Sequence, residues 1–198
     1  MKFLKNEKIK IAILASGKGS NAEKIIQHFH SADGQVEVDS IFSNRKHAGV
    51  FKIAEKYSIS AFYYSTVDFK EGVKRFIKEL KERNVSFIIL SGFLLKVPEE
   101  LCSSFKNRIL NIHPSLLPKY GGKGMYGHYV HDAVKQAKEK ETGITIHLVN
   151  ENFDDGKIIF QKSCDISQSD TAEDIALKVQ RLEHKHFPKV IEQYISNY

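Results

Sequence analysis

Short apolar runs alternate with segments of helical periodicity along this 198-residue chain, and this alternation is the feature that most restricts its fold. The runs 9–14, 87–90 and 109–112 contain almost no polar residue, as is typical of strands buried on both faces of a parallel sheet. Further strands are expected at 36–43, 61–64, 144–149 and 157–163, and helices at 50–57, 69–80 and 129–140 and from Asn21, Pro98 and Thr171. The alternation predicts a doubly wound α/β fold.

We expect a single domain over residues 1–198, built as a mostly parallel sheet with helices on both faces. Antiparallel strands are expected to join the sheet near the C-terminus, where the pattern is less regular. The hydrophobic share of 41% and the charged share of 27% are ordinary for a globular protein, and no repeat or low-complexity segment interrupts the chain.

Charge and cysteine content indicate the compartment and the ligands. A net charge of +6 suits phosphorylated or otherwise anionic ligands, and nothing resembles a nucleic-acid-binding module. Cys102 and Cys164 are too few for a disulfide framework, which favours buried thiols in a reducing cytosol. The start, Met1–Lys8, has no apolar core of a signal peptide, and no apolar run approaches the roughly 18 residues of a membrane span. We therefore expect a cytoplasmic protein without membrane or nucleic-acid partners.

A glycine turn at 17–19 joins the first strand to the helix that follows. Glycines let the backbone approach an anion, and the free amides at the start of a helix point at it, so the turn predicts a phosphate site. Ser20 and Glu23 are expected to form a capping box there. A tight turn without a ligand is the alternative.

The same turn also fits the pattern of a dinucleotide site, G-x-G-x-x-A. An NAD site would place an acid at the end of the second strand, but that strand ends in Ser43, Asn44 and Arg45. Arg45 would suit a 2′-phosphate, so an NADP-dependent oxidoreductase stays open, beside a mononucleotide-binding module.

The strand at 109–112 contains Asn111 and is followed by His113. A loop over 114–127 comes next and is long enough to be functional. Alternation along a strand puts Asn111 and His113 on one face, where ligands bind in open α/β sheets. A carboxamide beside an imidazole can hydrogen-bond a carbonyl and move a proton. A histidine that only caps the strand end is the alternative.

The acidic segment 152–156 lies between two expected strands and could place a carboxylate beside His113. Such a carboxylate would orient the imidazole and favour its protonated form, whereas the alternative is a solvated turn. His128 and His131 lie three residues apart on an expected helix, but no third ligand is near them, so they do not predict a zinc site.

Together these motifs resemble the phosphoribosylglycinamide formyltransferase family, the folate-dependent enzymes of purine synthesis. The resemblance rests on Ser-Gly-x-Gly-Ser-Asn at 16–21 and Asn-Ile-His-Pro-Ser-Leu-Leu-Pro-Lys-Tyr at 111–120, and it covers nearly the whole chain. Methionyl-tRNA formyltransferase and formyltetrahydrofolate deformylase look similar around 111–113, but those relatives carry extra domains that 198 residues would not hold.

The resemblance implies a Rossmann-like formyltransferase fold and transfer of a formyl group from the co-substrate 10-formyltetrahydrofolate to the amine of glycinamide ribonucleotide, without a metal. It implies that Asn111, His113 and Asp154 are catalytic. The implied folate contacts are Lys70, Leu94, Leu95, Lys96, Val97, Asn111, Asn150 and Asp154. The implied ribonucleotide contacts are Gly19, Ser20, Asn21, Gln180 and Glu183.

Two of the departures from the family pattern bear on the roles that can be carried over. Lys70 stands where the family often has arginine near the folate tail, and lysine keeps the charge but loses bidentate recognition of a carboxylate. The loop 121–127 differs in length and sequence, so no role is carried over to it. A formyltransferase acting on another amine, and a monomer or a homodimer, all remain compatible with the sequence.

Overall fold

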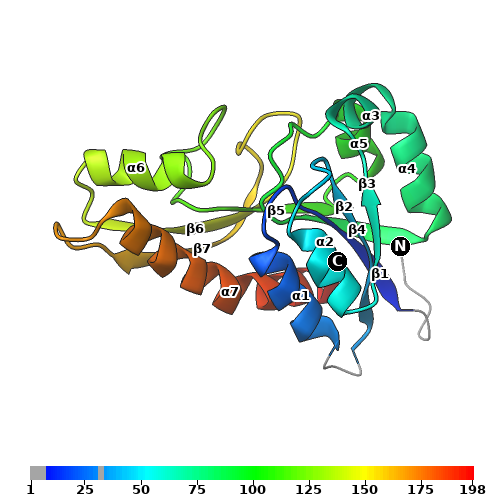
Figure 1. The fold of residues 1–198 in the computed structure, drawn as a ribbon, viewed down its shortest axis with the longest axis horizontal. Helices are drawn as coiled ribbons and strands as arrows, with labels where there is room; N and C mark the ends of the chain where they lie inside the picture. Colours follow the sequence, from blue (N-terminus) through cyan, green and yellow to red (C-terminus); the bar gives the residue numbers. More distant parts are fainter. Residues whose placement is uncertain (1–7, 31–33) are drawn as a thin grey trace. The chain divides into compact units, whose positions relative to one another are not determined.

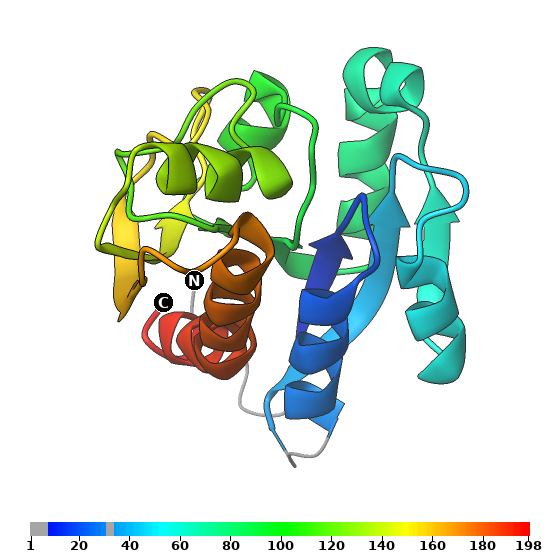
Figure 2. The ribbon, with the colours of Figure 1, turned by 60° about the vertical axis from the view of Figure 1, so that its left-hand side comes forward.

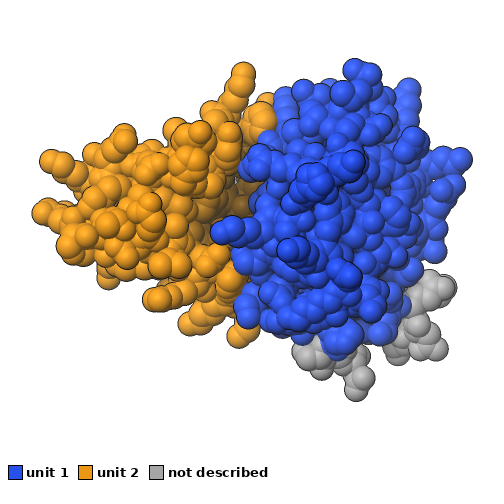
Figure 3. All heavy atoms as spheres, in the orientation of Figure 1, with its two compact units in different colours: residues 1–110 blue, residues 111–198 orange. Residues whose placement is uncertain are grey.

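The computed structural model describes residues 8–30 and 34–198. The chain divides after Leu110 into two compact units, unit 1 and unit 2, which Figure 3 colours separately. The expectation about a missing signal peptide concerns Met1–Glu7 and so lies outside the described residues. The expectation of a single domain over the whole chain stays a prediction.

Unit 1 is built on parallel strands. Its strands β1 (Ile9–Leu14), β2 (Val36–Ser43), β3 (Ser60–Tyr63) and β4 (Val85–Leu90) lie in the order β3-β2-β1-β4, followed by the start of β5 (Ile109–His113). The pairings of β1 with β2 and β4, and of β2 with β3, are all parallel. Leu14 lies opposite Phe42 on one side and Leu90 on the other, so three strands end at the same level. This common edge positions the glycine turn.

Helices cover both faces of the unit 1 strands (Figures 1 and 2). They are α1 (Ser20–His30), α2 (Val50–Lys56), α3 (Thr66–Glu71), α4 (Val73–Glu82) and α5 (Glu99–Ser104). The helices α1 and α2 pack against β2, whereas α4 packs against β4 and α5. Right-handed crossovers between parallel strands produce this two-sided arrangement.

One local expectation is wrong. The single helix expected over 69–80 is broken into α3 and α4 at Gly72, where a side chain would collide with the carbonyl oxygen of Asp68. The helix α1 begins at Ser20, close to the start expected at Asn21, and the capping box of Ser20 and Glu23 stays a prediction. The Glu23 carboxylate lies 2.7 Å from the Lys56 ammonium, so this side chain ties α1 to the end of α2.

An aromatic cluster forms the core of unit 1 between β2 and α4. The Phe76 ring lies 5.0 Å from Phe42, 5.1 Å from Tyr64 and 5.4 Å from Phe69, all measured between ring centroids. The pairs meet edge to face, which aromatic rings prefer because of their quadrupoles. The apolar stripe that predicted one helix therefore still faces one core, although two helices carry it.

Unit 2 contains the rest of β5, which pairs with β6 (Glu141–Leu148), and then β7 (Ile158–Asp165). The pairing of β6 with β7 is antiparallel, as expected for the C-terminal part of the chain. The helix α6 (His128–Gln136) packs against α7 (Ala172–Ser196), and α7 packs against β6 and β7 (Figures 1 and 2). None of the described helices combines the length and the apolar character that a membrane crossing requires.

Truncating Phe76 to alanine tests the packing of the unit 1 core. Phe76 is fully buried, so the cavity and the lost burial should cost about 3–5 kcal/mol of unfolding free energy, measured by urea denaturation. Val67→Ala is the control, because Val67 is 59% exposed and its truncation should change the free energy by less than about 0.5 kcal/mol. Equal losses for the two variants would contradict this placement of Phe76.

Candidate active site

The end of β5 presents two polar side chains to one carboxylate. Asn111 is half-buried and His113 is 4% exposed, as alternation along the strand allows for neighbours on one face. The Asn111 amide nitrogen donates to Asp154 Oδ1 over 3.4 Å, and His113 Nδ1 lies 3.4 Å from Asp154 Oδ2. The carboxylate expected beside His113 is therefore present, and all three residues belong to unit 2.

Asp154 comes from the loop between β6 and β7, and local backbone geometry holds it in place. Its φ of 52° lies in the left-handed region, which aspartate tolerates better than most residues. The Gly122 amide donates to Asp154 Oδ2 over 3.0 Å, so the loop after β5 also contacts the carboxylate. At Gly156 a side chain would collide with the carbonyl oxygen of Leu148, which explains a glycine at this point of the loop.

A second buried histidine, His147 on β6, completes what we call the Asp154 cluster: Asn111, His113, His147 and Asp154. His147 Nε2 lies 3.0 Å from the Asn111 amide nitrogen and 3.6 Å from Asp154 Oδ1. His147 Nδ1 lies 2.8 Å from the carbonyl oxygen of Leu148, which only accepts, so Nδ1 carries a proton. When the His147 ring is neutral, Nε2 therefore accepts from the Asn111 amide nitrogen. This hydrogen bond fixes the Asn111 amide with its nitrogen toward the cluster.

The loop after β5 closes over His113. His113 Nε2 lies 2.7 Å from the carbonyl oxygen of Tyr120 and must donate to it, because a carbonyl has no proton to give. The Ser115 hydroxyl donates to the carbonyl oxygen of Lys119 over 2.7 Å and steadies the same turn. The Nδ1 atom of His113 is thereby left facing Asp154.

Burial and neighbouring charges set the protonation of His113 and Asp154. Burial lowers the pKa of His113, and it outweighs the Asp154 charge and the Tyr120 carbonyl, which both raise that pKa. Burial raises the pKa of Asp154, but hydrogen bonding and charge from the two neighbouring histidines and the Gly122 amide outweigh it, so this pKa lies below its usual value. At pH 7 His113 is mainly neutral and Asp154 ionised. The carboxylate favours the protonated imidazole, as expected, but desolvation exceeds its effect on the pKa of His113.

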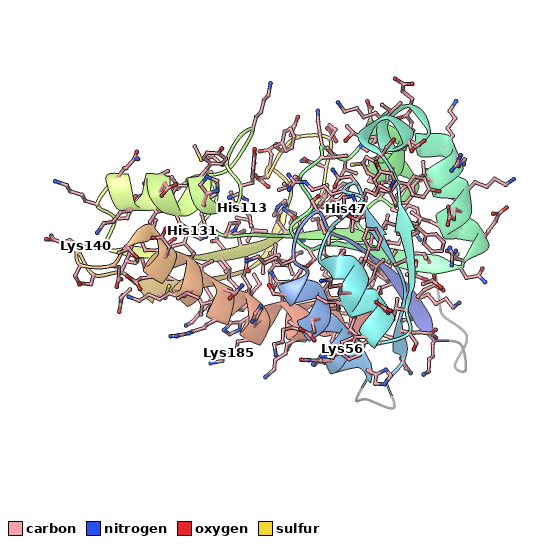
Figure 4. The ribbon with its side chains drawn as sticks, in the orientation of Figure 1. His47, Lys56, His113, His131, Lys140 and Lys185 are labelled. Carbon is pink, nitrogen blue, oxygen red and sulfur yellow. The ribbon has the colours of Figure 1, made fainter. Side chains whose placement is uncertain are left out.

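The third buried histidine of unit 2, His131 on α6, lies near His113 (Figure 4). Burial lowers the pKa of His131 and outweighs the Asp132 charge, which raises it. The described residues include no group of three or more histidine, cysteine, aspartate or glutamate side chains that could hold a metal ion. Cys102 is buried as expected, whereas Cys164 is half-buried, and burial raises the pKa of its thiol.

The glycine turn lies at the common edge of the unit 1 strands. Gly17 and Lys18 are exposed, and Gly19 has a φ of +85°. A side chain at Gly19 would meet Val50 at 2.8 Å, so both the backbone conformation and the close packing against α2 require glycine. The first turn of α1 begins directly after it with Ser20 and Asn21. The amides of this helix start lie beside an exposed turn, as a phosphate site requires.

The remaining predicted contact residues lie in separate parts of the two units. Leu94 and Leu95 are half-buried, Lys96 is exposed and Val97 is buried in unit 1, where Lys70 is exposed on α3. In unit 2, Gln180 is exposed and Glu183 half-buried on α7, and the side chain of Asn150 accepts from the backbone of Asn152. Each predicted set of contacts therefore has members in both units.

The formyl transferase family model matches residues 9–191 of the chain. The chain belongs to the formyl transferase family. It is 37% identical over 188 residues to the chloroplastic phosphoribosylglycinamide formyltransferase of Arabidopsis thaliana, a match that covers 92% of this chain and 64% of that protein. The chain therefore spans just under two thirds of the plant protein's length.

Two bacterial proteins match this formyl transferase family member along almost their whole length. The phosphoribosylglycinamide formyltransferase of Bacillus subtilis is 33% identical over 189 residues, which cover 94% of each chain. The crystal structure of phosphoribosylglycinamide formyltransferase from Bacillus halodurans is 32% identical, with a TM-score of 0.86, and the match covers 94% of this chain and 95% of that one. The predicted fold class, a Rossmann-like, mostly parallel sheet with an antiparallel addition, is confirmed.

Sequence reasoning missed one member of the Asp154 cluster, His147. The signal was a histidine between the apolar residues Ile146 and Leu148 in a strand whose residues are almost all buried. That signal identifies a buried imidazole, but the partners of His147 depend on which strand lies next to β6. The sequence alone therefore left the residue without a role.

The pH dependence of stability tests the protonation of His113. Its folded pKa lies below the unfolded value of about 6.5, so the unfolded chain binds more protons, and unfolding free energy falls as pH drops below about 6.5. His113→Gln removes this titration, and its unfolding free energy should fall less steeply between pH 7.5 and 5 in urea denaturation. The other histidines titrate in both proteins. A variant with an equal or steeper fall would contradict the lowered pKa.

Proposed function

We propose that this protein transfers a formyl group from 10-formyltetrahydrofolate to the amine of glycinamide ribonucleotide, in purine synthesis. The observation that carries the proposal is the Asp154 cluster, in which one buried carboxylate lies within 3.6 Å of an imidazole on each side and of a carboxamide. Family membership and the names of the similar proteins support the same reaction.

The chemistry needs two bond changes and one proton transfer. The amine nitrogen attacks the formyl carbon, and the carbonyl electrons move to oxygen to give a tetrahedral oxyanion. The bond from that carbon to the folate nitrogen then breaks, and the proton of the attacking amine ends on the folate nitrogen. The amine is already a nucleophile when neutral, so the protein must hold both reactants, stabilise the oxyanion and move the proton.

Asn111 is the first donor to the oxyanion in this proposal. One of its amide protons is held by His147 Nε2 over 3.0 Å, whereas the contact to Asp154 is longer, at 3.4 Å. The weakly held proton is the one that can be given to a substrate oxygen. Removing a single donor of this kind from an oxyanion site typically lowers the rate about 10²- to 10³-fold.

His113 is the second donor, and it must exchange a partner to act. Its Nε2 proton is bound to the carbonyl oxygen of Tyr120, so the oxyanion has to replace that carbonyl as the acceptor. The opposite ring nitrogen faces ionised Asp154, which stabilises any positive charge that develops on the ring. The loop that carries Tyr120 is thereby linked to the reaction.

Asp154 has two roles in the proposal, orientation and proton transfer. It accepts from the Asn111 amide and lies beside the ring of His113, and its lowered pKa keeps it ionised at neutral pH. An ionised carboxylate can accept the proton of the attacking amine and return it to the folate nitrogen through water.

The binding segments would supply the alignment of the two reactants. The glycine turn with Gly19, Ser20 and Asn21 would hold the ribonucleotide phosphate, and 94–97 together with Asn150 would hold the folate. Alignment of two reactants can contribute about 7–11 kcal/mol to lowering the barrier at best. For the remaining contacts we propose Lys70 at the folate tail, and Gln180 and Glu183 at the ribonucleotide.

We further propose that the chain works in the cytoplasm as a single domain over 1–198, without a metal, as a monomer or a homodimer. An NADP-dependent oxidoreductase had the glycine turn and Arg45 in its favour, and the formyl transferase family model argues against it. A formyltransferase acting on another amine uses the same cluster and differs only in the acceptor.

The direct test is folate release, followed by absorbance, from 10-formyltetrahydrofolate with and without glycinamide ribonucleotide. Release that depends on the ribonucleotide is expected. Release without any acceptor would instead indicate a deformylase, and no release in either case would contradict formyl transfer altogether.

Asp154→Asn tests the role of the carboxylate. The amide keeps the size of the side chain but cannot take a proton, so kcat should fall at least about 100-fold while ribonucleotide affinity changes little. Asp155→Asn is the matched control, because the adjacent Asp155 is exposed and its carboxylate binds the side chain of Asn152 instead of either histidine. Near-normal turnover of Asp154→Asn in the formyl transfer assay would refute this role.

A further inference from the structure

Ser16 lies at the end of β1 and bonds to the ends of two neighbouring strands of unit 1. Its side chain and backbone are 1% exposed. Its amide donates to the carbonyl oxygen of Gly92 over 3.0 Å, and its hydroxyl oxygen accepts from the amide of Leu94 over 3.0 Å. The hydroxyl also donates to Asn44 Oδ1 over 2.5 Å.

The hydroxyl has one proton, and the three groups fix where it points. Asn44 Oδ1 can only accept and the Leu94 amide can only donate, so the proton goes to Asn44 and a lone pair faces Leu94. Ser16 therefore joins chain segments that lie 28 and 78 residues away. A buried hydroxyl with both bonds made holds its partners in one geometry.

Two segments proposed to bind the substrates also meet at Ser16. Directly after Ser16 comes the turn 17–21, which Val50 anchors by donating to the Gly17 carbonyl over 3.2 Å. On the other side, Gly92 turns the chain with a φ of +67° into the segment 94–97.

We propose that Ser16 is a positioning residue that fixes the segment 94–97 against the start of the glycine turn. The assignment of substrates to the two segments rests on the proposed function, whereas the positioning itself rests on the three hydrogen bonds. Without the hydroxyl, the half-buried Leu94 amide and Asn44 side chain lose their partner. The segment 94–97 then relaxes, while the turn keeps its bond to Val50.

Ser91 provides a matched control within the same edge of the sheet. It ends β4, is 5% exposed and has a buried hydroxyl oxygen without a hydrogen-bond partner. Ser91→Ala removes the same atom as Ser16→Ala but breaks no bond. Both variants should melt cooperatively in circular dichroism, so that folding is established before the comparison.

Amide hydrogen exchange followed by NMR tests the positioning without any substrate. In Ser16→Ala the Leu94 amide should exchange at least about ten-fold faster than in wild type, while the amides of Ile13 and Ile89 in β1 and β4 keep their protection. Ser91→Ala should exchange like wild type at Leu94. Unchanged exchange of Leu94 in Ser16→Ala would overturn the proposal.

Binding and kinetics test the consequence for the substrates. Ser16→Ala should bind tetrahydrofolate about five- to ten-fold more weakly by calorimetry, and raise the KM of the formyl donor by a similar factor. The KM of the ribonucleotide and kcat at saturation should stay within about two-fold of wild type. Equal loss for both substrates, or loss in Ser91→Ala as well, would overturn a positioning role specific to 94–97.

The exchange and binding experiments test separately the positioning by Ser16 and the proposed function. If wild type binds no tetrahydrofolate and transfers no formyl group, the proposed function fails, and the exchange of Leu94 still decides whether Ser16 positions the segment. If Leu94 loses protection but tetrahydrofolate binds as in wild type, the link to folate binding is overturned.

Discussion

The burial of Asp154 among polar partners is the interaction on which the candidate site depends. A carboxylate taken out of water is costly unless hydrogen bonds and charges replace the lost solvation. Here the amides of Asn111 and Gly122 and the rings of His113 and His147 surround it. The two histidines and the Gly122 amide outweigh burial and keep its pKa below the usual value. Removing one partner would leave a buried charge partly uncompensated, so the partners are constrained as a group.

This constraint explains why segments distant in sequence have fixed local shapes. The left-handed backbone at Asp154 and the close approach of Gly156 to Leu148 direct the carboxylate back toward β5. The loop after β5 supplies the Gly122 amide, and the carbonyl of Tyr120 holds the proton of His113 on Nε2. The irregular segments on both sides of β6 are therefore parts of the site.

Much of the fold could be predicted from the sequence because strand burial and helix periodicity are local signals. The bounds of β1 and β2 match the ranges predicted for them. The placement of Asn111 and His113 on one face follows from alternation along one strand. Local signals failed where a backbone or tertiary contact decided the outcome. The helix stripe over 69–80 predicted one helix, but the contact of Gly72 with Asp68 divides it into two. The partners of His147 likewise depend on strand order, which periodicity does not contain.

The protonation of His113 shows a second limit of sequence reasoning. A nearby carboxylate predicts a raised imidazole pKa, but the sign of the shift depends on how deeply both groups are buried. Two neighbouring groups that both have lowered pKa values give a neutral imidazole beside an ionised carboxylate, which divides hydrogen-bond donation and proton acceptance between them. Ser16 and the glycine turn, in the other unit, follow the same principle of fixed hydrogen-bond geometry.

The most direct measurement is an NMR titration of the His113 ring and the Asp154 carboxyl carbon in the wild-type protein. Midpoints below 6.5 for His113 and below 3.8 for Asp154 are the predicted result, the two values being those of the unperturbed groups. A His113 midpoint above 6.5 would mean that the ring is charged beside the carboxylate, and would contradict the division of roles within the Asp154 cluster.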